Sequence, residues 1–182
     1  MTTPPFVADP DPGWPAAAAR LVTELHAALP GLLAPIEHIG STAVPGLPAK
    51  PVIDLMAATP DLAAFGSVAE ARLAALGYRR LDTGMTGRLF YRREPRATSA
   101  SHATHLHVVP ADSWETRNER ILRDHLLAHP ADAERYGALK RRLAAAGGGP
   151  DAYTRGKTAL VQELMDRAWI ARGLPIVDVW ET

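Results

Sequence analysis

The chain contains no cysteine in its 182 residues, which excludes disulfides, thiolate metal sites and a cysteine nucleophile. Its 20 basic and 20 acidic residues cancel, so the composition indicates neither nucleic acid nor an anionic membrane as a partner. No apolar run reaches 18 residues, and the N-terminus lacks the charged-then-apolar pattern of a secretory signal. We therefore expect no membrane association and a cytoplasmic location.

The composition that remains is typical of a globular protein. Hydrophobic residues make up 47% of the chain and charged residues 22%, and the length suffices for one domain with a substantial core. No internal repeat or low-complexity linker divides the sequence. We therefore expect one domain over residues 1–182.

Hydrophobic periodicity and turn residues predict an α+β fold with a mixed sheet and a helical C-terminal third. The first dozen residues are rich in proline and are expected to form an extended arm, and residues 94–101 a polar, mobile segment. The expected elements are a helix over 15–29, strands over 35–40 and 51–57, a helix between 61 and 77, a hairpin of strands 78–82 and 88–93, a strand over 104–109, and helices over 112–129, 131–146 and 151–172.

The stretch over residues 38–56, HIGSTAVPGLPAKPVIDLM, carries the first candidate site. Gly40 permits close approach of a ligand to the backbone, and the hydroxyls of Ser41 and Thr42 follow directly. Asp54 is the one acid in an apolar strand and is expected to be buried, where an unpaired charge is costly. A divalent cation such as Mg²⁺ would compensate it. The alternative is a structural carboxylate that accepts backbone hydrogen bonds beside the turn.

Five segments together resemble the GrpB family, a branch of the nucleotidyltransferase (DNA polymerase beta-like) superfold. Besides the stretch over 38–56, they are DPDPGWP at 9–15, HLHVV at 105–109, RDHL at 123–126 and YTRGK at 153–157. The resemblance covers nearly the whole chain. It implies a nucleotidyltransferase-like mixed sheet flanked by helices.

The resemblance also implies a set of functional positions, which this chain fills only in part. In nucleotidyltransferases a Gly-Ser turn is followed by a strand that bears two acids at alternate positions, and a third acid lies on a neighbouring strand. The acids hold two Mg²⁺ ions that bridge a nucleoside triphosphate such as ATP. Here Gly40 and Ser41 match the turn and Asp54 matches the first acid, but Met56 stands at the second acid's position. This departure counts against ordinary two-metal transfer.

His105 and His107 lie two residues apart in a predicted strand and therefore face the same side. If this strand lies beside that of Asp54, the two imidazoles stand where the third acid would be. His107 and Asp54 would then bind a transition metal, or the histidines would act as acid or base. His38 and His102 could join them. The alternative is a structural pair of strand histidines.

Three cations are candidates for binding phosphate or carboxylate: Lys50, Arg88 and Lys157. Lys157 follows Tyr153 by four residues, which places both side chains on one face of a helix. For each cation the alternative is a solvated surface charge.

The resulting hypothesis is an enzyme, a nucleotidyltransferase-like transferase or ligase, that acts on a small molecule with a nucleoside triphosphate and a divalent metal. Asp54, His105 and His107 are its expected catalytic residues. Two alternatives stay open. One is a non-catalytic nucleotide-binding or partner-assisting module, since domains that resemble this one also occur fused to dephospho-CoA kinase. The other is a repurposed pocket that catalyses condensation or ligation in a biosynthetic pathway.

Overall fold

The computed structural model describes residues 7–95, 102–147 and 149–179. Parts of the predicted arm and of the predicted polar segment, residues 1–6 and 96–101, lie outside the described residues. In chain order the elements are α1 (Trp14–Ala28), β1 (Ile36–Ile39), η1 (Ser41–Ala43), β2 (Val52–Thr59), α2 (Leu62–Ala75), β3 (Arg79–Leu81), β4 (Leu89–Arg93), β5 (Ala103–Pro110), η2 (Ala111–Thr116), α3 (Asn118–Ala128), α4 (Pro130–Ala146) and α5 (Gly149–Ala171), where η denotes a 3₁₀ helix.

The strands form one five-stranded sheet in the order β1-β2-β5-β4-β3. The central pair, β2 and β5, is parallel, and the other neighbours are antiparallel. In the parallel register Asp54 stands opposite His105 and Met56 opposite His107. The two strands that carry the predicted site are therefore direct neighbours.

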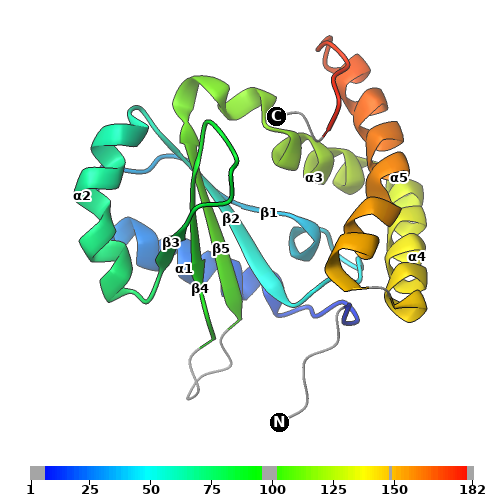
Figure 1. Ribbon diagram of the computed structural model, residues 1–182, viewed down its shortest axis with the longest axis horizontal. Helices are drawn as coiled ribbons and strands as arrows, with labels where there is room; N and C mark the ends of the chain where they lie inside the picture. The colour runs from blue at the N-terminus through cyan, green and yellow to red at the C-terminus, as the bar shows by residue number, and fades with distance from the viewer. Residues whose placement is uncertain (1–6, 96–101, 148, 180–182) are drawn as a thin grey trace.

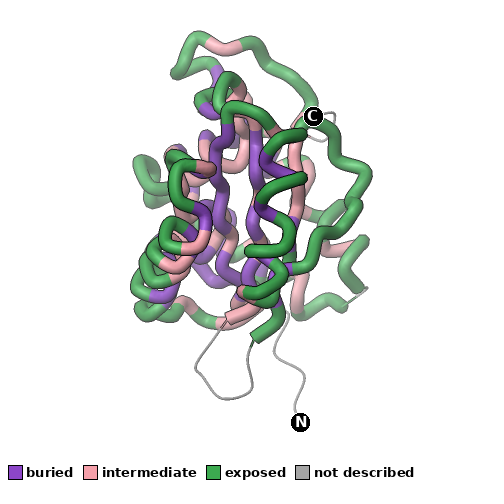
Figure 2. Tube along the Cα trace, turned by 90° about the vertical axis from the view of Figure 1, so that its left-hand side faces the viewer, coloured by how far each residue is buried: buried purple, intermediate pink, exposed green. Residues whose placement is uncertain are grey.

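Alternation along the central strands separates two faces of the sheet. Ile53, Leu55 and Leu106 belong to the core that α1 and α2 cover, whereas Asp54 and His105 face the side of α4 and α5. Figure 1 shows α2 to the left of the strands and α4 and α5 to their right, and Figure 2 shows buried stretches of the chain in the middle of the molecule. The predicted class is confirmed: the fold is α+β, with one mixed sheet flanked by helices and a helical C-terminal third.

A buried ionic network fixes the C-terminal helices to one another. Asp132 at the start of α4 accepts from His125 Nε2 of α3 at 2.8 Å and from Arg167 Nη2 of α5 at 2.9 Å. Burial opposes ionisation of Asp132, but the hydrogen bonds from Arg167 and His125 outweigh it and lower the pKa of the carboxyl. This junction holds α4 and α5 in place over the sheet.

The single helix predicted over 112–129 is wrong, because the structure divides it into η2 and α3. Arg117 between them is extended, at φ −68° and ψ 121°. Its guanidinium donates to the Ser113 hydroxyl at 2.7 and 3.0 Å and to the Gly87 carbonyl at 2.8 Å. Gly87 is 30 residues away from Arg117 in the sequence. Helical periodicity depends only on residues close together in the chain, so it could not predict that the helix is interrupted at Arg117.

None of the helices in the described part of the chain is long and apolar enough to cross a membrane.

Candidate functional site

The turn after β1 lies directly against the Asp54 carboxylate. Gly40 has a φ of 72°, a conformation that L side chains rarely adopt. A Cβ at this position would lie 2.7 Å from Oδ2 of Asp54, closer than van der Waals contact allows. Glycine is therefore required both by its backbone conformation and by the approach of the turn to the acid.

Asp54 and His105 form a hydrogen-bonded pair across the parallel strands. Nδ1 of His105 lies 2.9 Å from Oδ1 of Asp54. The side chains are 28% and 26% exposed, so the prediction of a buried Asp54 is wrong. The carboxylate has an imidazole partner and borders a cavity. With Asp54 ionised, Nδ1 carries the ring proton and Nε2 is the basic nitrogen.

This pair lies at one side of a cavity of about 310 Å³, named here the lysine cavity. Three segments complete its wall: the turn and the start of β2, helix α4, and the first turns of α5. The residues that line it, besides Asp54 and His105, are Ser41, Thr42, Lys50, Val52, Tyr136, Lys140, Pro150, Tyr153, Thr154 and Lys157. The cavity thus lies where the sheet meets the C-terminal helices.

All lysines of the protein line this cavity. The chain has three lysines against 17 arginines, and Lys50, Lys140 and Lys157 are all in the wall. Two of them follow a tyrosine by four residues, Tyr136 on α4 and Tyr153 on α5. Each Nζ lies over the ring of its tyrosine, at 5.0 Å for Lys140 and 4.5 Å for Lys157, within cation–π range. Two neighbouring helices therefore present the same pair of side chains to one space.

Lys140 is buried without a charged partner. Its exposed fraction is 2%, and its Nζ has no hydrogen-bond partner among the described residues. Burial lowers the pKa of Lys140 to about 7; repulsion by Lys157 and Arg141 adds to this, and attraction by Asp54 opposes it. Burial also lowers the pKa of Lys157. An anion in the cavity would relieve both effects.

The two hydroxyls of the turn differ in what they can offer a ligand. Thr42 donates its proton to the Val52 carbonyl at 3.0 Å and lies 2.9 Å from Nε2 of His38. Burial lowers the pKa of His38 to about 4, so its neutral ring donates to Thr42. The Ser41 side chain is hydrogen-bonded to the phenol of Tyr136, and Ser41 is only half-buried at the cavity wall, whereas Thr42 is buried.

Arg88 and His107 are not among the residues that line the lysine cavity. The Arg88 guanidinium donates to Nδ1 of His107 at 3.2 Å and forms an ion pair with Glu119 on α3. Burial lowers the pKa of His107 to about 4, so its ring is neutral. Phe90 packs between the two strand histidines, with ring centroids 5.1 Å from His105 and 4.9 Å from His107. The structure therefore brings His105 to Asp54 and His107 to Arg88.

The donor atoms at this site do not fit a two-metal centre. Met56, at the position of the second acid, is fully buried. The described residues contain no group of three or more histidines and acids that could hold a metal ion. Three lysines against one aspartate also give the lysine cavity a net charge of +2 when all four are ionised. Such a cavity attracts anions and repels divalent cations.

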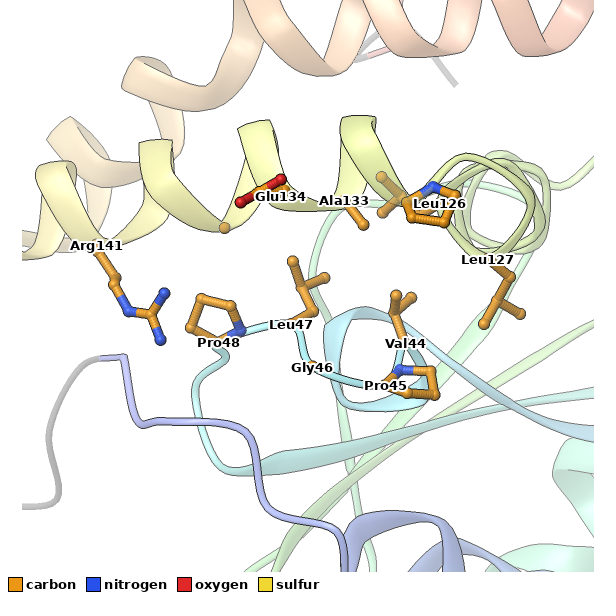
Figure 3. A pocket seen from close by; sticks show the side chains of 12 residues that line it. Val44, Pro45, Gly46, Leu47, Pro48, Leu126, Leu127, Ala133, Glu134 and Arg141 are labelled. Atoms are coloured by element: carbon orange, nitrogen blue, oxygen red, sulfur yellow. The ribbon is translucent and has the colours of Figure 1, made fainter.

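A larger cavity, of about 490 Å³, borders a neighbouring face of α4 (Figure 3). Its wall is largely apolar, with Val44, Leu47 and Leu126 facing the space. Of its charged residues, Glu134 and Arg141, the second pairs with Asp9 at 2.9 Å. No nucleophile, histidine or lysine lines this cavity, so chemistry is better supported at the lysine cavity.

Sequence reasoning missed Tyr136 and Lys140, although two signals pointed to them. Lysine is rare in a chain whose basic residues are mostly arginine, so each lysine is informative. The spacing of Tyr136 and Lys140 also repeats that of Tyr153 and Lys157. Both signals are visible without a structure.

Comparison with known proteins gives matches over most of the chain. The family model described as GrpB protein matches residues 4–167. A UPF0157 protein of Pseudomonas aeruginosa is 37% identical over 92% of this chain and 69% of its own length, and one of Deinococcus radiodurans is 34% identical over 87% and 80%. A dephospho-CoA kinase of Mycolicibacterium paratuberculosis is 33% identical over 88% of this chain but only 45% of its own length. The crystal structure of conserved protein GrpB from Enterococcus faecalis has a TM-score of 0.81 at 27% identity and covers 92% of this chain and 99% of that one.

Proposed function

This chain belongs to the GrpB family, and from that premise we propose that it binds a nucleoside triphosphate in the lysine cavity and transfers part of it to a small molecule. One observation carries the proposal. Lys140 is buried beside Lys157 without a hydrogen-bond partner among the described residues. An unpaired buried ammonium is costly, and a bound phosphate would pair it.

The expected mode of binding follows from the positions of the polar groups. Lys140 and Lys157 would hold the phosphates from the helical side, and the exposed Lys50 would close over them from the turn. The Ser41 hydroxyl and the backbone at Gly40 would approach from the sheet. The rings of Tyr136 and Tyr153 support the two ammonium groups from behind. Lysines would thus supply the positive charge that metal ions supply elsewhere, and no step of the proposed reaction needs a metal.

The Asp54–His105 pair would supply the acid–base chemistry. Asp54 orients the imidazole, so that Nε2 accepts the proton of the acceptor's hydroxyl group. The acceptor oxygen forms a bond to the α-phosphorus as the bond to pyrophosphate breaks. Pyrophosphate leaves with the electron pair, and its charge stays paired with Lys140 and Lys157.

A second candidate is a nucleotide-binding module without catalysis. Met56 at the second acid's position favours it, and so does the likeness to part of a dephospho-CoA kinase. In this case the lysine cavity would bind the triphosphate equally well, but no pyrophosphate would form. The third possibility, condensation or ligation on the same cavity, would release phosphate or pyrophosphate only when the correct pair of substrates is present.

The test is a binding screen followed by a turnover assay. ATP, GTP, CTP and UTP are added in separate titrations, and the melting temperature and the heat of binding are recorded. Ligand at about 100 times its Kd stabilises the folded state by about 2.7 kcal/mol. The absence of binding by all four nucleotides and by pyrophosphate would refute the proposal. Binding without pyrophosphate release, across a panel of small alcohols, would favour the non-catalytic module.

A further inference from the structure

A third cavity, of about 260 Å³, lies beside the ion pair of Arg88 and Glu119. Its walls are apolar side chains from α3 and α5, among them Leu122, Val161 and Met165. The loop that precedes β4 closes it from another side. We name it the ion-pair cavity. It is distinct from the lysine cavity and shares no lining residue with it.

The polar groups of this cavity are incompletely paired. Arg88 Nη1 serves both Glu119 Oε1 and His107 Nδ1. In the part of the chain that the structure describes, Nε of Arg88 and Oε2 of Glu119 are buried without a hydrogen-bond partner. The Arg88 side chain is only 5% exposed. The same ion pair therefore contains one unsatisfied donor, Nε of Arg88, and one unsatisfied acceptor, Oε2 of Glu119. Leaving such a buried group without a hydrogen bond destabilises the folded state by about 1–3 kcal/mol.

The ion-pair cavity also adjoins the lysine cavity on the same face of the sheet. On α5, Val161 follows Lys157 by four residues, one helical turn further along. On β5, His105 borders the lysine cavity, and His107 accepts a hydrogen bond from Arg88 of the ion-pair cavity. Phe90 packs against both imidazole rings. Two ligands bound in these cavities would be neighbours.

We propose that the ion-pair cavity binds a small, mostly apolar, uncharged molecule whose polar head both donates and accepts a hydrogen bond, such as an alcohol or a carboxamide. The Arg88–Glu119 pair is neutral as a whole, so a charged head would meet a like charge at one of the two groups. An alcohol or amide satisfies Nε of Arg88 and Oε2 of Glu119 together. The volume of the ion-pair cavity lies just below the range of about 300–1,000 Å³ that is typical of pockets for drug-sized ligands. This indicates a small molecule.

This proposal uses none of the lysines and does not depend on the proposed function. Its test uses five probes of similar size: benzyl alcohol, benzamide, benzoate, benzylamine and toluene. Binding to the full chain is measured by saturation-transfer NMR and by titration of backbone amide shifts. We expect benzyl alcohol and benzamide to bind at least tenfold more tightly than the other three and to shift amides of α3 and α5.

Two variants locate the binding. Met85 lines the ion-pair cavity and is 38% exposed, so Met85→Trp narrows the cavity with little risk to the fold. Val68→Trp places the same bulk on an exposed position of α2 and is the matched control. Loss of benzamide binding in Met85→Trp alone supports the proposal. Equal binding by both variants, or benzoate binding as tight as that of benzamide, would overturn it.

Discussion

Replacing Lys140 by methionine should stabilise the protein and weaken ligand binding at the same time. Methionine keeps the length of the side chain and removes the charge. The pKa of Lys140 is lowered from 10.5 to about 7, which corresponds to about 5 kcal/mol of unfavourable free energy for the ammonium form. A residue with a purely structural role would show the opposite sign, because its removal would cost stability.

The pH dependence of this effect has a definite sign. Between pH 7 and pH 10.5 the unfolded chain holds the Lys140 proton and the folded chain releases it, so the stability of the wild type rises with pH across this window. That stability is present above pH 10.5 and is lost as the pH falls through about 7. The Lys140→Met variant lacks this dependence. Its advantage should therefore be greatest at pH 7 and below and should shrink towards pH 10.

The assay compares melting temperatures and urea unfolding at pH 6, 7 and 9. At about 2–4 °C per kcal/mol for a chain of this size, we expect the variant to melt at least about 5 °C higher at pH 7. Loss of a charge-assisted hydrogen bond, about 1.5–3 kcal/mol, should weaken triphosphate binding about 10- to 150-fold. Arg142→Met removes a charge from an exposed position on the same helix and should change neither quantity. A Lys140→Met variant that is less stable, or that binds as tightly as the wild type, would refute the reasoning.

Three further changes test the site and the fold. Asp54→Asn should abolish turnover. It should leave triphosphate binding unchanged or make it tighter, with or without EDTA, because the carboxylate of Asp54 repels phosphate. If calorimetry shows that the wild type binds only with Mg²⁺ and that the variant does not bind, a metal bridge is present instead. Gly40→Ala should lower the free energy of unfolding by about 2 kcal/mol or more, since its Cβ would meet Asp54 in a left-handed conformation; equal urea midpoints would contradict this. The wild type should lose stability as the pH falls below about 4 and through the lowered pKa of Asp132, and Asp132→Asn should be less stable at pH 7 and show a weaker acid dependence.

Much of the sheet could be predicted because its determinants are local. Alternation with a period of two depends on neighbours in the chain, and it correctly placed Met56 on the same face as Asp54, and His107 on that of His105. The turn at Gly40 was also recognisable from residue types alone. These features need no knowledge of distant segments.

The rest depends on contacts between segments far apart in the chain. Arg117 interrupts a helical pattern and contacts the loop before β4. His107 stands opposite Met56 rather than Asp54 and accepts a hydrogen bond from Arg88. Neither contact leaves a periodic trace in the sequence. The position of Lys140 in the lysine cavity likewise depends on how α4 docks, although its spacing from Tyr136 could have been noticed.

The charge of the site separates it from the metal-dependent arrangement that its turn resembles. A centre for two divalent cations needs several carboxylates, and their repulsion is relieved only when the metals bind. In this chain Met56 follows Asp54 by two residues, His105 stands opposite Asp54, and lysines supply a net positive charge. Lys140 and Lys157 likewise repel one another, and a bound anion would relieve this repulsion. Lys140 is buried and Lys157 half-buried, so the folded chain holds the two ammonium groups together at a cost to its stability, and we expect a ligand that carries phosphate to relieve this cost.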